Sequence, residues 1–591
     1  MFVLKFNPIK MNRHFVASIL NWVLWLSVLL KAGWCAAATF TWNGSTSTDW
    51  FNSTNWIPVG VPASTDTIYF TNGTTINLTN TVTIAGSFNW SSGTLSGKPM
   101  TITSAGVLNI SGSVSLENVL TNAGTVTMTG AAYLIVYNNN SSYFGGIYNQ
   151  AGALWDIQTN ASIACGYCSD EFFDNAGTFR KSGGSGTSAI DVGFTNSVLV
   201  TNLMGTLDFD NGGVLTGTYG TAAGATIDFA GGSFTMGTPP VITGLGVCEF
   251  TGTTLTLLQT APGNLLLAGG SVVLGSGFQN GGSITNLTLN GATLPGTNTV
   301  TGTLNWASGT VSGVLTIAGG GVLNITGNDV LENVLTNAGT VTMSGAGELT
   351  IYNNDSSYHG GVYNQAGALW DIQTNASIAC GYCSDEFFDN AGTFRKSGGS
   401  GTSAIDVGFT NSATVTALMG ILSFNENFIT TSGTLAFGVS GLANLGQVNV
   451  SGSVALNGTV SVTWLDGFTP SVGNSFTLLD YGSHSGTFAS IILPAGSSGA
   501  PTYGATAFSL MITNVTTQTN PPVFLNINLV NPSTVVVSWP SSATNYTLQT
   551  NANLSSGSWG NVTSGISTVS TNDVFTNTVS GNPDFFRLQS P

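Results

Sequence analysis

Two Cys-x-x-Cys motifs are the residues whose spacing most directly suggests chemistry. They read Cys-Gly-Tyr-Cys, with cysteines at Cys165 and Cys168 and again at Cys380 and Cys383. A thioredoxin-like site requires the motif to open a helix after a strand, and no helix signal follows either copy. A zinc site formed by both pairs is also excluded in a stacked β-fold, since roughly eight layers at about 4.8 Å would separate them by about 40 Å. In an exported chain we expect a local disulfide within each motif.

Carboxylates gather around each motif. Glu171 and Asp174 would supply a general acid and a general base if both side chains projected outward together. Glu386 and Asp389 repeat this pair in the second copy. A solvated turn held by ion pairs would account for the same cluster of carboxylates without catalysis. We therefore expect no catalytic residues, and a polysaccharide lyase or hydrolase that uses these carboxylates is the alternative.

Aromatic side chains near the carboxylates are candidates for a ligand surface. Trp155 and Tyr148 are candidates to stack on a sugar ring, with Asp170 as a charged group of the same surface. Trp370, Tyr363 and Asp385 repeat this set in the second copy. Aromatic residues at strand positions next to a turn are more often part of the core. The Gly-Gly-Ser-Gly run from Gly183 lacks the aspartate of calcium-binding nonapeptide repeats. The sequence thus predicts no metal site and no cofactor, while its acidity leaves calcium binding open.

A duplicated block contains all of these residues. The stretch Tyr148–Ser197 recurs without a change as Tyr363–Ser412. Its flanks recur less strictly at the same offset, so that the run from Leu116 returns from Leu331. The duplicated unit therefore extends well beyond the identical block. A repeat of this length decides the architecture before any local pattern does.

A shorter period within each unit predicts that architecture. Ala-Gly or Met-Gly steps, each followed by an apolar and β-prone run, begin at Ala123, Ala151, Ala176 and Met204. They are roughly 25 to 28 residues apart, a period typical of solenoid coils, and such rungs bury their apolar faces by stacking. A β-sandwich array would instead repeat its strands roughly every 8 to 12 residues. We predict an all-β chain that contains a right-handed parallel β-helix from residue 75 to about residue 450.

Composition and charge narrow the class of protein. Charged residues make up 6% of the 591 residues, glycine numbers 78, and 42% of the chain is apolar, which argues against both a helical and a disordered protein. Four of the ten basic residues and none of the 26 acidic residues precede Thr39, so a chain without this segment has 6 basic and 26 acidic residues, a net charge of −20. The sequence therefore argues against nucleic acid as a partner, because phosphate contacts need basic clusters.

The segment that ends at Ala38 predicts export. Basic residues precede an apolar run from Phe15 to Leu30, and the small residues Ala36–Ala38 follow it, which is the pattern of a secretory signal peptide. The apolar run is shorter than the roughly 20 residues of a membrane span. Cys35 raises a lipoprotein alternative, but Trp34 before it is too large for the usual lipoprotein signal. We expect a secreted or surface-displayed chain with no membrane span after signal removal.

The residues after the signal resemble a known class of exported protein. Trp42-Asn43-Gly44, Trp50 and Trp56, with Val61-Pro62 and Ile68–Phe70, are similar to the opening module of bacterial β-solenoids that carry autotransporter-associated β-strand repeats. The resemblance implies an N-terminal cap that covers the first rung and prevents edge pairing. The segment from Leu456 to Phe488 looks like the closing segment of such passenger proteins.

The C-terminal residues resemble a different module. The stretches Val535–Pro540, Asn545–Thr550 and Phe585–Leu588 are similar to a compact fibronectin type III or immunoglobulin-like domain, as in secreted proteins of Verrucomicrobia-type bacteria. The resemblance implies a small β-sandwich with Trp539 and Tyr546 in its core.

These patterns together predict seven segments. They are a signal peptide at 1–38, a cap at 39–74, unit 1 at 75–212, a β-rich connector at 213–290, unit 2 at 291–427, a closing segment at 428–516 and the C-terminal module at 517–591. We expect a non-enzymatic structural or adhesive protein that binds a polysaccharide or a cell-surface ligand, and the sequence does not decide its oligomeric state.

Overall fold

The computed structural model describes residues 37–516, 523–531, 533–552, 558–578 and 584–589. This part of the chain is all-β apart from a 3-10 turn at Ser53–Asn55, which confirms the predicted fold class. It forms two compact units. One contains the stacked strands, and the other contains the residues from Met511 onward with the segments 470–474 and 493–500. The predicted signal peptide lies outside the described residues except for positions 37 and 38.

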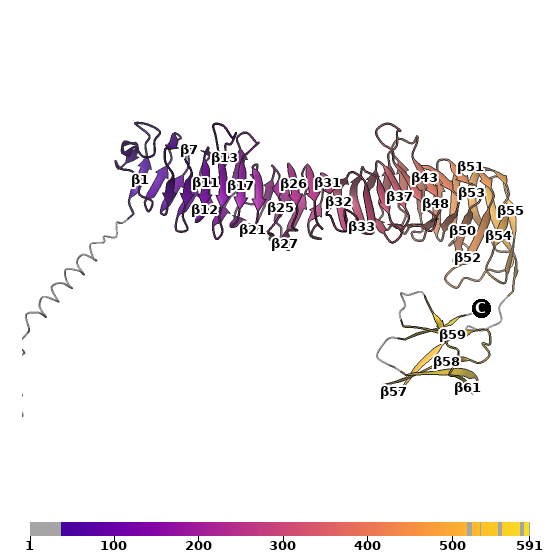
Figure 1. Ribbon diagram of the computed structural model, residues 1–591. Helices are drawn as coiled ribbons and strands as arrows, with labels where there is room; N and C mark the ends of the chain where they lie inside the picture. Colours follow the sequence, from indigo (N-terminus) through magenta and orange to yellow (C-terminus); the bar gives the residue numbers. More distant parts are fainter. Residues whose placement is uncertain (1–36, 517–522, 532, 553–557, 579–583, 590–591) are drawn as a thin grey trace, which may run out of the picture. The chain divides into compact units, whose positions relative to one another are not determined.

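The first unit is a β-solenoid of about 19 turns, and Figure 1 shows its strands following one another along the stack. One turn consists of three short strands, for example β9 (Val107–Ile110), β10 (Val114–Leu116) and β11 (Val119–Asn122). Each strand pairs in parallel with the corresponding strand of the next turn. Buried and less buried residues alternate along the strands, as a pleated strand with one face toward a core requires.

The turns vary in length. Four successive turns place their first strand at Thr125, Leu154, Thr178 and Leu199, in register. Each turn in this series is therefore shorter than the one before it. The first two predicted intervals follow the turns, but the third, which ends at Met204, reaches β22 (Thr206–Phe209) of a neighbouring sheet. As a turn length the third interval is wrong, because loops of different lengths separate the strands.

A group of tryptophans covers the first turn. Trp42, Trp50 and Trp56 are buried, and the Trp56 ring packs edge-to-face on the other two with centroids 5.0 and 4.8 Å away. The strands in this region are β1 (Thr39–Trp42), β2 (Trp56–Ile57) and β3 (Thr67–Phe70). Because β2 pairs antiparallel with β1, it closes the outer edge of the sheet.

Parallel stacking extends past both predicted limits of the helix. At the N-terminal end β1 already pairs in parallel with β3, so the predicted cap residues 39–74 also supply the first turn. At the other end β50 (Thr434–Val439) pairs in parallel with β52 (Thr459–Trp464), which pairs with β54 (Ser490–Ile492). The limits of 75 and about 450 are therefore too narrow.

Inside the stack, asparagine side chains form a buried ladder. Asn122, Asn149, Asn175 and Asn196 end four neighbouring strands, and each Nδ2 donates to the Oδ1 of the next asparagine at 2.8, 2.7 and 2.8 Å. Each Nδ2 also donates to a backbone carbonyl, such as that of Thr178 from Asn149 at 3.1 Å. A second ladder has the same three distances at Asn337, Asn364, Asn390 and Asn411. These ladders satisfy buried polar groups at the same place in each turn.

The connector changes which strands of unit 1 and unit 2 lie in the same parallel ladder. The strand β17 (Phe172–Asn175) of unit 1 and the strand β42 (Ser377–Cys380) of unit 2 belong to one continuous ladder. The parallel pairings run through β20 (Gly193–Asn196), β23 (Gly213–Val214), β26 (Ser233–Met236), β29 (Thr254–Leu257), β31 (Ser271–Leu274), β32 (Ile284–Leu294), β33 (Asn298–Val311), β36 (Asp329–Leu331) and β39 (Glu348–Ile351). In unit 1, however, the equivalent of β42 is β16 (Ser162–Cys165), which lies in another sheet. The connector thus shifts the repeat by one sheet relative to the turns.

The second unit contains two antiparallel sheets. One consists of β57 (Asn526–Asn531), β58 (Thr534–Pro540), β62 (Asn572–Thr578) and β61 (Ile566–Val569), and the other of β60 (Gly560–Asn561), β59 (Thr547–Asn551) and β63 (Phe585–Gln589). Val537, Trp539 and Leu548 are buried at the centre of this unit, and Tyr546 packs against them. Trp539 and Tyr546 are thus core residues, as the sequence predicts.

One buried carboxyl group distinguishes the two copies. Asp329 on β36 (Asp329–Leu331) is 1% exposed and replaces Val114 of the first copy. Neither carboxyl oxygen has a hydrogen-bond partner among the described residues. Burial raises the pKa of Asp329 to about 7. The second copy therefore carries an acidic group where the first carries an aliphatic one.

We predict that Asn149→Ala destabilises the solenoid by about 2–3 kcal/mol, because it leaves the buried Asn122 and Asn175 amides without one partner each. The measurement is the chemical or thermal unfolding of the full chain. The control is Asn109→Ala, since Asn109 pairs with Asn89 at 2.9 Å on the partly exposed outer face and should cost less than about 1 kcal/mol. Equal losses in the two variants would contradict a special role for the buried ladder.

We predict that Asp329→Val, which restores the residue of the first copy, stabilises the chain by about 3 kcal/mol at pH 8. The unfolded carboxyl ionises near pH 4 and the folded one near pH 7, so the wild-type chain loses this stability as the pH rises from about 4 to about 7. Unfolding curves from pH 5 to pH 8 measure the effect. Val114→Asp should introduce the same pH dependence in the first copy, and an unchanged stability of Asp329→Val at pH 8 would refute the assignment.

Candidate functional site

Two neighbouring loops in each copy form the candidate site. In the first copy they are residues 137–145, between β13 (Tyr133–Val136) and β14 (Gly146–Asn149), and residues 166–171, between β16 and β17. We call them the loop pair. The second loop pair is residues 352–360 and 381–386. Figure 1 shows loops that project from the stack next to β13 and next to β37 (Val334–Asn337).

Glu171 joins the two loops of the first pair. Its carboxylate accepts hydrogen bonds from the backbone N–H groups of Tyr167 and Ser169 at 2.8 Å and of Asn138 at 3.2 Å. The side chain is 2% exposed. Burial raises the pKa of Glu171, but the backbone donors outweigh burial and hold the pKa below its ordinary value. A buried carboxylate that accepts several N–H bonds is an anchor for the loops.

The disulfide closes the second loop of each pair. Cys165 is bonded to Cys168, and Cys380 to Cys383, which is the pairing that the sequence predicts. Gly166 inside this ring lies against the ring of Tyr137, and a Cβ atom there would be 2.1 Å from Tyr137 Cδ1. Glycine is therefore required for this close approach.

Three tyrosines pack together on the loop pair. The ring centroids of Tyr137, Tyr143 and Tyr167 are 5.8 to 6.1 Å apart. Tyr143 is positioned by Asn139, whose Oδ1 accepts hydrogen bonds from three successive N–H groups, including that of Tyr143 at 3.1 Å. Tyr167 lies between the two cysteines of the disulfide ring and is 49% exposed. We call these three residues the tyrosine cluster.

The second copy reproduces this geometry. Glu386 accepts from Tyr382 and Ser384 at 2.8 Å and from Asn353 at 3.2 Å. The rings of Tyr352, Tyr358 and Tyr382 have centroids 5.6 to 6.0 Å apart, and Tyr382 is 49% exposed. The flanks of the loop differ, since Asp355 replaces Asn140 and His359 replaces Phe144. The features common to both copies are the carboxylate anchor, the disulfide and the tyrosine cluster.

The carboxylates proposed for the enzyme alternative do not form an acid–base pair in either copy. Glu171 is buried beneath the loops and fully engaged as an acceptor, whereas Asp174 lies on the outer side of β17 in register with Tyr148 and Thr195. Burial raises the pKa of Asp174. In the second copy Glu386 and Asp389 have the same placement. The geometry does not meet the condition that the enzyme alternative sets, namely that both members of a pair project outward.

The prediction that Trp155 and Trp370 belong to a ligand surface is wrong. Trp155 and Trp370 are 0% exposed, and each packs edge-to-face on a core phenylalanine at 5.0 Å. They occupy inward positions of their strands, so neither can stack on an external sugar. Asp170 and Asp385 are exposed on the loop pairs. The exposed aromatic residues here include Tyr148 and Tyr167 with their twins Tyr363 and Tyr382, and Phe144 in the first copy alone.

The basic residues of the duplicated block have structural partners. Arg180 donates to both carboxylate oxygens of Asp156, at 3.0 and 2.8 Å, and Arg395 bonds Asp371 in the same way. Burial raises the pKa of Asp156, but hydrogen bonds, first from Arg180, outweigh it and lower the pKa.

A lysine of the same block is buried without an ion pair. Lys181 is 0% exposed, and its Nζ donates to the carbonyls of Thr159 and Gly183 and to Ser188 Oγ at 2.7 to 3.1 Å. Burial lowers its pKa to about 8. Lys396 is likewise buried, with Ser403 Oγ at 2.9 Å. The cations of the block therefore connect neighbouring turns.

Carboxylates form a row on the outer face after the first copy. Asp208, Asp228 and Glu249 lie in register on three successive strands, β22, β25 (Thr226–Phe229) and β28 (Val247–Phe250). Burial, with the neighbouring carboxylates, raises the pKa of Asp208 to about 6. Among the described residues, no three His, Cys, Asp or Glu side chains are arranged to hold a metal ion.

In the second copy an amide replaces one of two carboxyl groups that face each other in the first copy. Asp191 and Asp210 face each other in the first copy, and burial followed by the charge of Asp210 raises the pKa of Asp191 to about 6. At the equivalent positions Asn425 donates to Asp406 at 2.6 Å. The two carboxyl groups of the first copy need a proton on one of them to form their hydrogen bond, whereas the amide of Asn425 donates to Asp406 while that carboxyl group is ionised.

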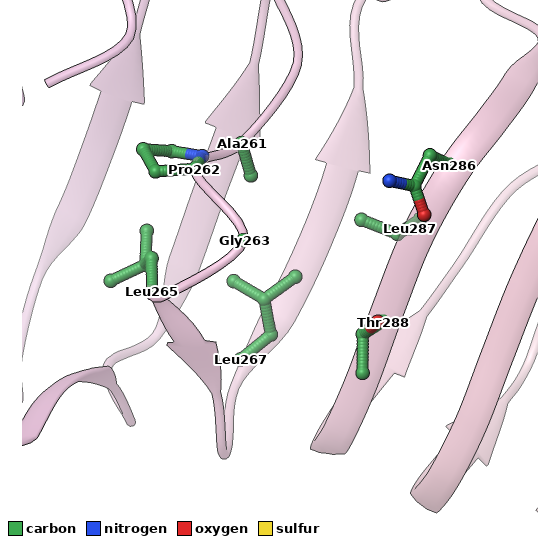
Figure 2. A pocket seen from close by; sticks show the side chains of 8 residues that line it. All are labelled: Ala261, Pro262, Gly263, Leu265, Leu267, Asn286, Leu287 and Thr288. Carbon is green, nitrogen blue, oxygen red and sulfur yellow. The ribbon is translucent and has the colours of Figure 1, made fainter. Parts of the chain in front are cut away.

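A small hollow marks the connector. It has a volume of about 60 Å³ and lies between β30 (Leu266–Leu267) and β32 (Ile284–Leu294). Figure 2 shows Pro262, Leu265 and Leu287 among the residues around it. A hollow of this volume has room for only a few water molecules.

Sequence reasoning found the cysteines and Glu171 but missed Tyr137 and Tyr143. Both lie upstream of the identical block, in the flank that recurs with changes. The sequence signal for these two residues is that they recur as Tyr352 and Tyr358 although nearby residues of the same loop differ between the copies. The asparagine ladders have a signal as well, since Asn122 and Asn175 each precede an Ala-Gly step.

No family model matches the chain, and no curated protein matches it. In the part of the chain that the structure describes, no helix has the length and apolar character needed to cross a membrane. The fold therefore defines the class, a β-solenoid protein with a duplicated loop pair.

We predict that Glu171→Gln loosens the first loop pair and leaves the solenoid folded. The amide replaces one acceptor oxygen by a donor, which faces the backbone N–H groups that the carboxylate binds. Hydrogen exchange at Tyr167 and Ser169 should accelerate by about tenfold or more, while β14 and β17 keep their protection. The unmodified second copy is the internal control. Unchanged exchange in residues 166–171 would contradict the anchoring role.

Proposed function

We propose that the protein is a secreted or surface-displayed structural protein with an adhesive function, and that the two loop pairs are its contact surfaces. The observation that carries this proposal is the construction of one loop pair twice with the same hydrogen bonds, disulfide and ring packing. A solenoid provides a rigid support on which loops of variable length project without disturbing the stacked strands.

Duplication supports adhesion in preference to catalysis. Two copies of a weak site on one support raise the effective concentration of the second binding event and increase avidity. An enzyme, in contrast, generally has a single enclosed pocket with convergent polar groups. The carboxylates best suited to acid–base chemistry are separated by their placement, since Glu171 is buried and Asp174 lies on the outer side of a strand.

Export is part of the same proposal. The N-terminal basic and apolar pattern is that of a signal peptide, and each copy carries a disulfide in an exposed loop, a bond that persists in oxidising compartments. The resemblance to bacterial passenger-type solenoids and to a fibronectin-like terminal module points in the same direction.

The test is binding of the chain from Thr39 to Pro591 to whole cells and to an array of polysaccharides, with a variant that lacks both loop pairs. The variant replaces residues 138–144 and 353–359 by short glycine-serine linkers and carries Glu171→Gln and Glu386→Gln. We expect saturable binding by the wild type and a loss of at least tenfold in the variant, while circular dichroism shows the same β-structure. Formation of a degradation product from any polysaccharide, or binding that does not depend on the loops, would overturn the proposal.

A further inference from the structure

The tyrosine clusters have a shape that restricts what they bind. Three centroids about 6 Å apart have a common centre about 3.4 Å from each ring, which is shorter than the 3.5–4.0 Å separation of touching carbon atoms. The rings therefore leave no space between them for a ligand. Tyr143 and Tyr167 are tilted by only 31° to each other, whereas Tyr137 is edge-on to Tyr167 at 78°. The half-exposed Tyr167 with its neighbour Tyr143 therefore supplies the aromatic face, and the cluster is not an aromatic cage of the kind that encloses a quaternary ammonium group.

The charges around the cluster exclude an anionic ligand. The exposed Asp170 adjoins Tyr167 in the loop, and Glu171 beneath it remains ionised because its pKa is lowered. Within the duplicated block no described cation is free to compensate, since Arg180 is in an ion pair and Lys181 is buried. The exposed Lys98 lies two turns from the first loop pair, but its equivalent in the second copy is Gly313, so it is not a shared feature. Nucleic acids, acidic polysaccharides and anionic lipids would meet repulsion at this surface.

A cationic ligand would be attracted by Asp170 and Asp385 in both copies, but it would not bind the two loop tips alike. The tip of the first loop pair consists of Asn139, Asn140, Ser141 and Ser142, which are neutral donors and acceptors. The second copy has Asp355 in place of Asn140. A cation would distinguish these two tips, whereas the rings and the neutral asparagine and serine residues are common to both.

From these observations we propose that each tyrosine cluster is a stacking surface for the sugar rings of a neutral polysaccharide, and that the loop disulfide holds it in the binding shape. The inference rests on the proposed adhesive function and names its ligand. A pyranose ring presents C–H groups on its faces and hydroxyl groups at its rim, which match an aromatic face bordered by neutral hydrogen-bonding groups. A polymer of identical units can occupy both copies at once.

The disulfide contributes pre-organisation. Tyr167 lies within the ring that Cys165 and Cys168 close, and its N–H is held by Glu171 at 2.8 Å. A bond that restricts the loop before the ligand arrives lowers the entropy lost on binding. The disulfide is thus expected to matter for affinity and little for the stacked strands.

The experiment measures binding of the chain from Thr39 to Pro591 to soluble neutral glucans, mannans and xylans, to the acidic polymers pectate and alginate, and to cationic chitosan. Tyr167→Ala with Tyr382→Ala should reduce binding to a neutral polymer by at least tenfold. Tyr167→Phe with Tyr382→Phe, which keeps the rings, should stay within about threefold of the wild type. Either alanine substitution alone should give the same intermediate affinity, because it removes one of two equivalent sites.

A serine variant tests the disulfide. Replacement of Cys165, Cys168, Cys380 and Cys383 by serine should weaken binding by about threefold to tenfold without a change in β-structure by circular dichroism. Binding as tight as that of the wild type would refute pre-organisation by the disulfide.

The outcomes separate this inference from the proposed function. Preferential binding to pectate, alginate or chitosan, neutral-polymer binding that survives both alanine substitutions, or the absence of binding to every neutral polymer overturns the tyrosine assignment. In each of these cases loop-dependent adhesion to whole cells would leave the proposed function standing. Loss of cell adhesion in the tyrosine variant, together with neutral-polymer binding in the wild type, supports both.

Discussion

The stacking of each turn on the next is the constraint on which the other features of the solenoid depend. A single turn has short strands and cannot satisfy its backbone or cover its apolar face alone. Inward side chains therefore meet the equivalent side chains of the adjacent turn. Phenylalanine and asparagine can both pack on an identical residue of the next turn. The rings of Phe173 and Phe194 stack with centroids 5.4 Å apart, and Asn149 Nδ2 donates to Asn175 Oδ1 at 2.7 Å. Like residues attract each other in this arrangement.

Charged residues cannot repeat in the same way, because like charges in adjacent turns repel. This explains why 6% of the chain is charged, and it explains how the remaining charges are arranged. Asp156 is opposed by Arg180 in the next turn, and Glu171 is surrounded by N–H groups. Where acids do stack, as at Asp208 and Asp228, the pKa of the carboxyl group rises. The molecule thus tolerates charge where a loop or an opposite charge is available.

Much of the fold was accessible from the sequence, because the repeat is a direct record of the stacking. The duplicated block and the Ala-Gly steps predicted a β-solenoid, and the Cys-Gly-Tyr-Cys spacing predicted local disulfides. The sequence left the role of Trp155 open between the core and a ligand surface, since the inward or outward direction of a strand residue depends on a register that loops of unequal length obscure. The tyrosine cluster was also missed, because Tyr137 and Tyr167 are distant in the sequence and meet through one turn of the stack. Periodicity shows which residues recur, and the lengths of the loops decide which of them meet.

The identity of the two blocks poses a problem for the folding chain. A strand such as β14 offers its neighbours the same edge as β40 (Gly361–Asn364), so pairing with the wrong copy would satisfy nearly the same contacts. Sequence separation distinguishes the two pairings. The native partner strand is one turn away in the sequence, whereas a swapped partner lies in the other copy. Closing a loop of roughly 200 residues in place of one of roughly 25 residues costs about 2 kcal/mol more in entropy. Pairing each turn with its neighbour in the sequence avoids this cost, so the short loop closure favours the native pairing between strands whose residues are nearly identical.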